Sequence, residues 1–165
     1  MRYWNSLKKY MKKHIVMVSI IITMLLSLFA STQLNYFFWL PDFLAMMLWF
    51  WILNNFSSIR LRTIFFVGLV MDILSNTYLG LHPIFYIVVV YWAVLKRQRL
   101  AVYDYGIQSM AIGLSLLAGK IVMTILLLLS GRPFVGWKFF ISVITSALLW
   151  SMLNKLMYSK FYTKS

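Results

Sequence analysis

The feature that most constrains this chain is a series of long apolar stretches separated by short, mostly basic segments. The stretches cover residues 15–34, 40–56, 63–75, 82–95, 105–129 and 137–158. A helix needs roughly 20 apolar residues to cross the hydrocarbon core of a bilayer. Hydrophobic residues make up 62% of the chain, which is more than a water-soluble surface allows. The sequence therefore predicts an all-α, polytopic membrane protein, with six transmembrane helices in one domain spanning residues 1–165.

The placement of the basic residues predicts the topology. Sixteen Lys and Arg residues stand against three acids, which gives a net charge of +13. If both termini face the cytoplasm, every basic residue except Lys120, Arg132 and Lys138 falls on a cytoplasmic segment, as the positive-inside rule requires. Contact with anionic lipids then accounts for the positive charge, and we expect no nucleic acid as a partner.

The region 63–95 is expected to be a hairpin, because basic residues flank it at both ends. Each arm then has only about 15 residues, or ~22 Å of helix, against a hydrocarbon core of roughly 30 Å. Either the bilayer thins here, or the tip of the hairpin lies below the membrane surface and is sheltered by other helices.

Asp72 lies inside this hairpin, in an otherwise apolar run. A bare carboxylate at that depth costs at least a few kcal/mol, so it must be neutral, paired or facing a polar cavity. One interpretation is an ion pair with Lys120, the single intramembrane cation, at an axial offset of ~7 Å by helical rise. In the other, Lys120 extends outward toward the interface, and Asp72 bonds locally to polar groups. These local candidates are Ser75, Asn76 and Thr77.

The amino-terminal segment, residues 1–14, has an amphipathic pattern at helical spacing. Its aromatic and apolar residues share one face, and the other face carries Lys8, Lys9, Lys12 and Lys13. This pattern predicts a cytoplasmic helix that lies on anionic lipids or docks a cytoplasmic partner.

Enzyme signatures are missing from the sequence. The chain has no Cys, and its two His residues lie far apart, so we expect no metal site. No nucleotide-binding loop, zinc-protease motif or nucleophile elbow is present. We therefore expect a protein that is not an enzyme and that needs no cofactor.

Two motifs resemble those of a known family. The first is G-x-x-x-D-x(7)-G, formed by Gly68, Asp72 and Gly80, and the second is Pro41–Asp42 at the start of the second apolar stretch. With the order of spans and charges, they resemble MreD, a family of small rod shape-determining membrane proteins of bacteria. The resemblance implies that these five residues form a structural or partner-binding motif.

The resemblance also implies a set of partners. MreD-like proteins are taken to bind MreC, which has one span and a periplasmic coiled coil. The complex lies in the cytoplasmic (inner) membrane, beside MreB filaments and beside RodA with its partner transpeptidase, which build peptidoglycan. In this chain Asn76 stands where the family often has Gly.

The family fold resembles the six-helix substrate-binding component of energy-coupling-factor transporters. An alternative function is therefore a small-molecule-binding subunit of a vitamin transporter. The outer segments of this chain offer few polar groups for such a ligand, which favours the assembly role.

Overall fold

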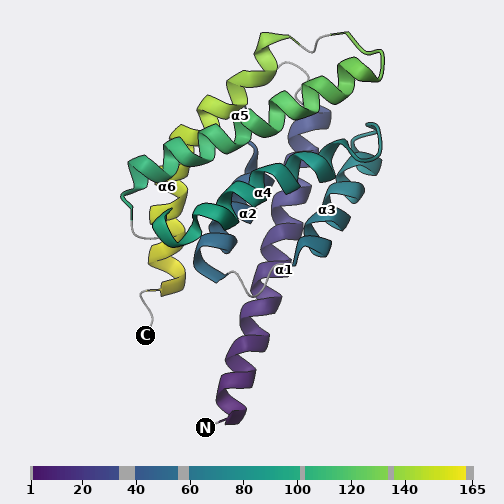
Figure 1. The fold of residues 1–165 in the computed structure, drawn as a ribbon. Coiled ribbons are helices and arrows are strands. Elements are labelled where there is room, and N and C mark those ends of the chain that lie inside the picture. The colour runs from purple at the N-terminus through teal and green to yellow at the C-terminus, as the bar shows by residue number, and fades with distance from the viewer. Residues whose placement is uncertain (1, 34–39, 56–59, 101–102, 134–135, 163–165) are drawn as a thin grey trace.

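The computed structural model describes residues 2–33, 40–55, 60–100, 103–133 and 136–162. Within these ranges the regular structure is helical throughout (Figure 1). The elements are α1 (Arg2–Gln33), α2 (Phe43–Asn55), α3 (Leu61–Leu74), α4 (Leu81–Leu100), α5 (Tyr105–Leu129), the 3-10 helix η2 (Trp137–Phe140) and α6 (Ile141–Tyr162). The prediction of an all-α fold is confirmed, and the hairpin expected over 63–95 is present as α3 and α4.

One helical stretch of the described chain, Gly106–Leu129, is long and apolar enough by itself to cross a membrane. Three shorter apolar stretches, His14–Phe29, Phe43–Asn54 and Ile141–Met152, fall below that length. The six crossings therefore stay a prediction. The start of α1 and the end of α6 lie at one end of the bundle, and the α5–α6 connection lies at the other (Figure 1), as that prediction requires.

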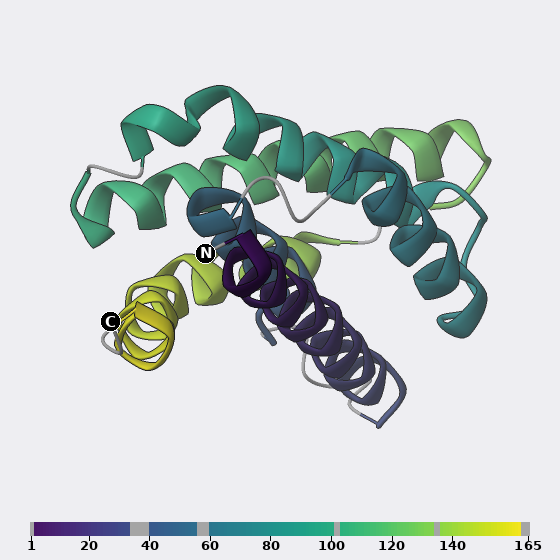
Figure 2. The ribbon, with the colours of Figure 1, turned by 90° about the horizontal axis from the view of Figure 1, so that it is seen from below.

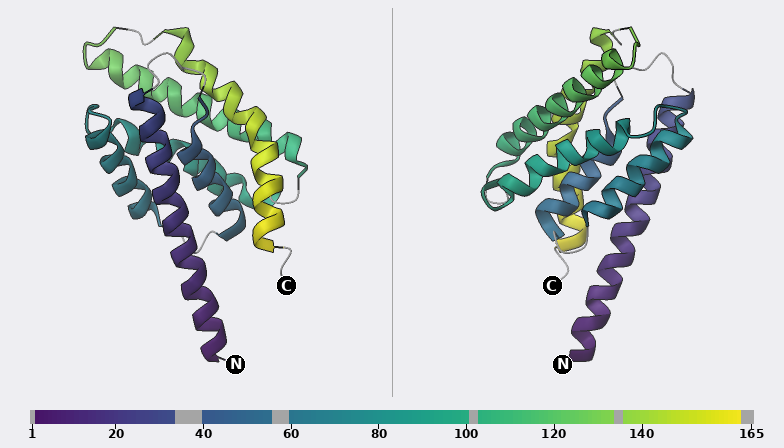
Figure 3. Two further views of the ribbon diagram at one scale, coloured as in Figure 1. Left: turned by 180° about the vertical axis from the view of Figure 1, so that it is seen from behind. Right: turned by 45° about the vertical axis from the view of Figure 1, so that its right-hand side comes forward.

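Helix α1 is continuous over 32 residues, ~48 Å at 1.5 Å per residue, and its first half projects from the bundle (Figure 3). Residues 1–14 were expected to form a separate surface helix. The described part of this segment is instead the projecting end of α1, since no Gly or Pro between Arg2 and Gln33 breaks the helix. The side chains of the four expected surface lysines, Lys8, Lys9, Lys12 and Lys13, lie outside the described part of the structure.

The core is built around α2. Every residue from Leu44 to Leu53 except Met47 is buried, as expected for a helix that is apolar on all sides. Helix α2 packs against α1, α4 and α6, and Figure 2 shows α1 and α6 across α2 from the α4–α5 pair. Trp49 of α2 donates its indole N–H to the Val89 carbonyl of α4 (3.1 Å) and packs edge-on against Trp150 of α6.

The outer surface is unusually apolar. Large side chains such as Ile22, Phe29, Leu114 and Leu148 are more than half exposed. Contiguous apolar surface of this kind is typical of contact with lipid or with other membrane helices. The polar side chains that are buried must therefore find their hydrogen-bond and ion-pair partners within the bundle.

Candidate functional site

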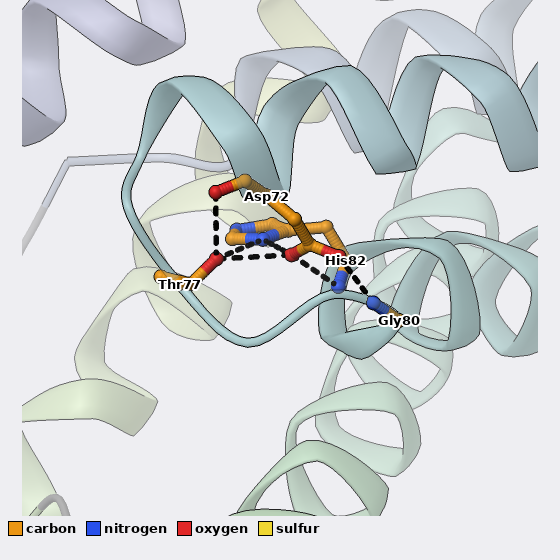
Figure 4. A network of polar contacts seen from close by, with 4 residues as sticks. All are labelled: Asp72, Thr77, Gly80 and His82. Carbon is orange, nitrogen blue, oxygen red and sulfur yellow. Dashed lines mark hydrogen bonds and ion pairs between the residues drawn. The ribbon is translucent and has the colours of Figure 1, made fainter.

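The carboxylate of Asp72 is fully buried near the end of α3, and the hairpin tip folds back over it (Figure 4). Its Oδ2 accepts a hydrogen bond from the Gly80 N–H at 2.6 Å. Its Oδ1 accepts one from the His82 N–H at 3.1 Å and one from the Thr77 hydroxyl at 3.0 Å. The Nδ1 of His82 lies 2.6 Å from the same Oδ1. All of these partners come from six consecutive residues of the tip, 77–82.

This network caps α4 across the turn. The first N–H groups of a helix have no partner within that helix, and a carboxylate that accepts from them also interacts favourably with the positive end of the helix dipole. Asp72 takes this role for Gly80 and His82, which lie just before and just inside the start of α4. The Thr77 N–H in turn donates to the Asp72 carbonyl at 3.0 Å and closes the end of α3. One residue thus fixes both ends of the turn.

The backbone of the tip depends on two positions with positive φ. Gly80 has φ 105°, a conformation that side chains rarely adopt. Asn76 has φ 52°, which an Asn tolerates better than most residues. Asn76 can therefore stand where the resemblance led us to expect a Gly.

Gly68 allows the two arms of the hairpin to approach closely. A Cβ placed on Gly68 would lie 2.5 Å from the Cα and the N of Pro83 in α4, which is too close for any side chain. The Gly68, Asp72 and Gly80 positions of the motif therefore act together: one sets the distance between the arms and the other two fix the turn.

In the structure Lys120 pairs with Asp42 and not, as one interpretation predicted, with Asp72. The Nζ of Lys120 lies 3.3 Å from Oδ2 of Asp42 and 4.0 Å from the centre of the Phe139 ring. Lys120 therefore turns toward η2 and the start of α2, while the tip residues occupy Asp72. Of the three local candidates, Thr77 donates to the carboxylate, and sequence reasoning missed the contact with His82.

The Pro41–Asp42 motif anchors the start of α2. Oδ2 of Asp42 accepts a hydrogen bond from the Ser142 hydroxyl at 3.2 Å, and the Asp42 N–H donates to Oγ of Ser146 at 2.8 Å. The side chain of Lys120 is only 5% exposed and that of Asp42 is 27% exposed. This cluster links α2, α5 and α6, and removing one partner would leave a poorly solvated charge.

The Asp72 cluster does not have the geometry of a catalytic triad. The hydroxyl of Thr77 lies 3.4 Å from His82 Nδ1, the nitrogen that faces Asp72, so the imidazole does not bridge the hydroxyl and the carboxylate as it does in a catalytic triad. The described residues contain no group of three His, Cys, Asp or Glu side chains that could hold a metal ion. The polar groups are engaged with one another, which is an arrangement for holding helices together.

The fold and the site thus define a small, strongly basic helical protein with an apolar exterior, in which Asp72 and Asp42 join helices. The chain belongs to the rod shape-determining protein MreD family, whose model matches residues 8–160. MreD is a family of bacterial membrane proteins with a role in rod shape determination, and it is not a known enzyme family. No curated protein and no solved structure matches the chain. The expected likeness to the transporter component therefore stays a prediction.

Proposed function

We propose that this protein is a non-enzymatic subunit of the cell-elongation complex in the cytoplasmic membrane, and that it binds MreC through the α3–α4 hairpin. The observation that carries the proposal is the use of Asp72: a fully buried carboxylate has its hydrogen bonds within the hairpin. Such a group stabilises a shape and is not free to act on a substrate. A stable shape is what a binding partner in a membrane requires.

The proposed binding surface is the outer face of α3. It carries large exposed apolar side chains at helical spacing, namely Phe65, Phe66, Val70, Ile73 and Leu74. Lipid tails are as apolar as a partner helix, so helix association in a bilayer depends on close packing of preformed surfaces. The Asp72 network and the Gly68–Pro83 contact fix the two arms, and they therefore fix this surface before MreC binds.

The cytoplasmic side of the protein is proposed to meet anionic lipids and the rest of the complex. The basic residues at the start of α3 and the end of α4 fit this role, as does the projecting first half of α1 with its four lysines. Each basic residue near an anionic surface adds about 1 kcal/mol of attraction. In this proposal the protein helps to position RodA and its partner transpeptidase, and thus peptidoglycan synthesis, relative to MreB filaments.

Site-specific photo-crosslinking in cells tests the MreC interface. A photoreactive amino acid replaces Phe66 or Ile73 on α3, and a control replaces Leu148 on α6, which is equally exposed and apolar. We expect adducts with MreC from the two α3 positions and none from position 148. Adducts from position 148 alone would place MreC on a different face and overturn the proposed surface.

A further inference from the structure

A cavity of about 550 Å³ opens between the hairpin tip and the end of α5. Its inner wall is apolar and is formed by Leu81, Met123 and Leu127, of which the first two are buried. Its rim is formed by exposed residues, most of them polar: Asn76, Thr77, Tyr78, Arg132 and Pro133. The volume is within the range of pockets that hold small ligands.

Arg132 gives this rim a fixed positive charge. Its Nε–H donates to the Tyr78 hydroxyl at 3.2 Å, and its guanidinium carbon lies 5.4 Å from the centre of the Tyr78 ring. An Arg is charged at any physiological pH, and the hydrogen bond to Tyr78 raises the pKa of Arg132 further. With Nε occupied by Tyr78, the two terminal amino groups still offer the end-on fork of the guanidinium, a geometry that suits phosphate or carboxylate oxygens.

The protein has no acid of its own for this guanidinium. Of the three acids in the chain, Asp72 is bound to the tip and Asp42 to Lys120. The third, Asp104, precedes the start of α5, whereas Arg132 follows its end. The cavity therefore combines an unmatched cation with an apolar wall.

We propose that this cavity binds an anionic phospholipid, with its phosphate on Arg132 and the Asn76 amide, and the start of one acyl chain against Leu81, Met123 and Leu127. A soluble anion would leave the apolar wall without a partner, and a neutral metabolite would leave the guanidinium without one. The position of the cavity fits a lipid as well. It lies at the carboxyl end of α5, the helix long enough to cross the membrane, where headgroups are expected.

Lipid binding at this place would act on the hairpin tip. Thr77 belongs both to the rim of the cavity and to the Asp72 network, and Tyr78 links the tip to the α5–α6 connection through Arg132. A phosphate that holds Arg132 in place therefore stabilises the turn that Asp72 caps. This site does not overlap the proposed contact with MreC, which lies on the outer face of α3.

Native mass spectrometry of the purified full-length protein tests the proposal. The protein is delipidated and titrated with phosphatidylglycerol or with phosphatidylcholine of the same acyl chains. We expect one phosphatidylglycerol to be retained, at least about tenfold more tightly than phosphatidylcholine. Both lipids offer a phosphate to Arg132, but the quaternary ammonium of phosphatidylcholine places a like charge beside the guanidinium, whereas phosphatidylglycerol is net negative. Arg132→Gln should remove this preference. Arg132→Lys should keep part of it, since Lys supplies the positive charge without the paired N–H donors of the guanidinium.

Two further variants keep the test specific. Arg60→Gln removes one exposed charge at the start of α3, on the proposed cytoplasmic side. It should weaken the diffuse attraction to anionic lipid on that side and leave the single, tightly retained phosphatidylglycerol in place. Leu127→Phe fills the apolar wall and should weaken lipid retention while leaving the charge in place. Equal losses in Arg132→Gln and Arg60→Gln would show general electrostatic attraction and overturn the site. Displacement of the lipid by glycerol 3-phosphate at millimolar concentration would show a soluble phosphate ligand and would also overturn it.

Discussion

Asp72→Asn should loosen the hairpin tip, although the Asn side chain has nearly the same shape and volume as the Asp side chain. The carboxylate accepts the Gly80 N–H at 2.6 Å and the His82 N–H at 3.1 Å, on different oxygens. An Asn has one acceptor oxygen, and its amide presents N–H groups to the second donor. The variant therefore loses one charge-assisted hydrogen bond, leaving its buried donor unpaired, and turns the other into a weaker neutral bond, which together cost about 3 kcal/mol for local opening of the tip. The His82 ring loses its charged partner as well.

Hydrogen exchange of the tip measures this loss directly. A free-energy change of about 3 kcal/mol corresponds to roughly a hundredfold faster exchange of amides that open locally. We expect this change for the Gly80 and His82 amides in lipid nanodiscs, while amides in the middle of α2 keep their protection. Asp104→Asn is the matched control, because Asp104 precedes α5 and makes no side-chain capping bond. Unchanged protection at Gly80 and His82 in Asp72→Asn would refute the capping role.

The remaining predictions concern the other contacts that hold the bundle. Lys120→Met should destabilise the fold by about 3 kcal/mol, because it leaves Asp42 without its charged partner. A double-mutant cycle of Lys120→Met with Asp42→Asn should show strong coupling, and a cycle of Lys120→Met with Asp72→Asn should be additive within about 0.5 kcal/mol. Additive effects in the first cycle and coupling in the second would instead support an ion pair between Asp72 and Lys120. Gly68→Ala should lower the midpoint of thermal unfolding and reduce the free energy of unfolding by about 1–3 kcal/mol, since its Cβ would meet the Pro83 backbone at 2.5 Å. Gly106→Ala is the matched control, because a Cβ there meets nothing within 4 Å; an equal effect of both would argue against the close packing of α3 and α4.

The positions of the helices could be predicted because membrane-type helices consist of unbroken apolar stretches. Basic residues on both sides of 63–95 predicted the turn between α3 and α4, and the absence of Gly and Pro from 2–33 could have predicted the continuous α1. The amphipathic pattern of residues 1–14 describes which residues share a face, and it does not require the helix to end.

The partners of Asp72 and Lys120 could not be predicted in the same way. Helical rise gave the depth of Asp72 and Lys120 along the bundle, but it does not give the direction in which each side chain points. The contact of Asp72 with His82 depends on the backbone of the tip, including the positive φ of Asn76 and Gly80. Asp42 could have been found as the partner of Lys120, because both lie toward the outer end of the expected spans.

Cell shape gives the most direct test of the central claim, that Asp72 holds the hairpin in the form that the elongation complex needs. A strain that lacks this protein is complemented with the wild type, with Asp72→Asn or with Asp104→Asn, at matched membrane levels. We predict that the wild type and Asp104→Asn restore rod-shaped cells and co-purify with MreC, and that Asp72→Asn does neither. Rod-shaped cells with undiminished MreC recovery from Asp72→Asn would contradict the claim.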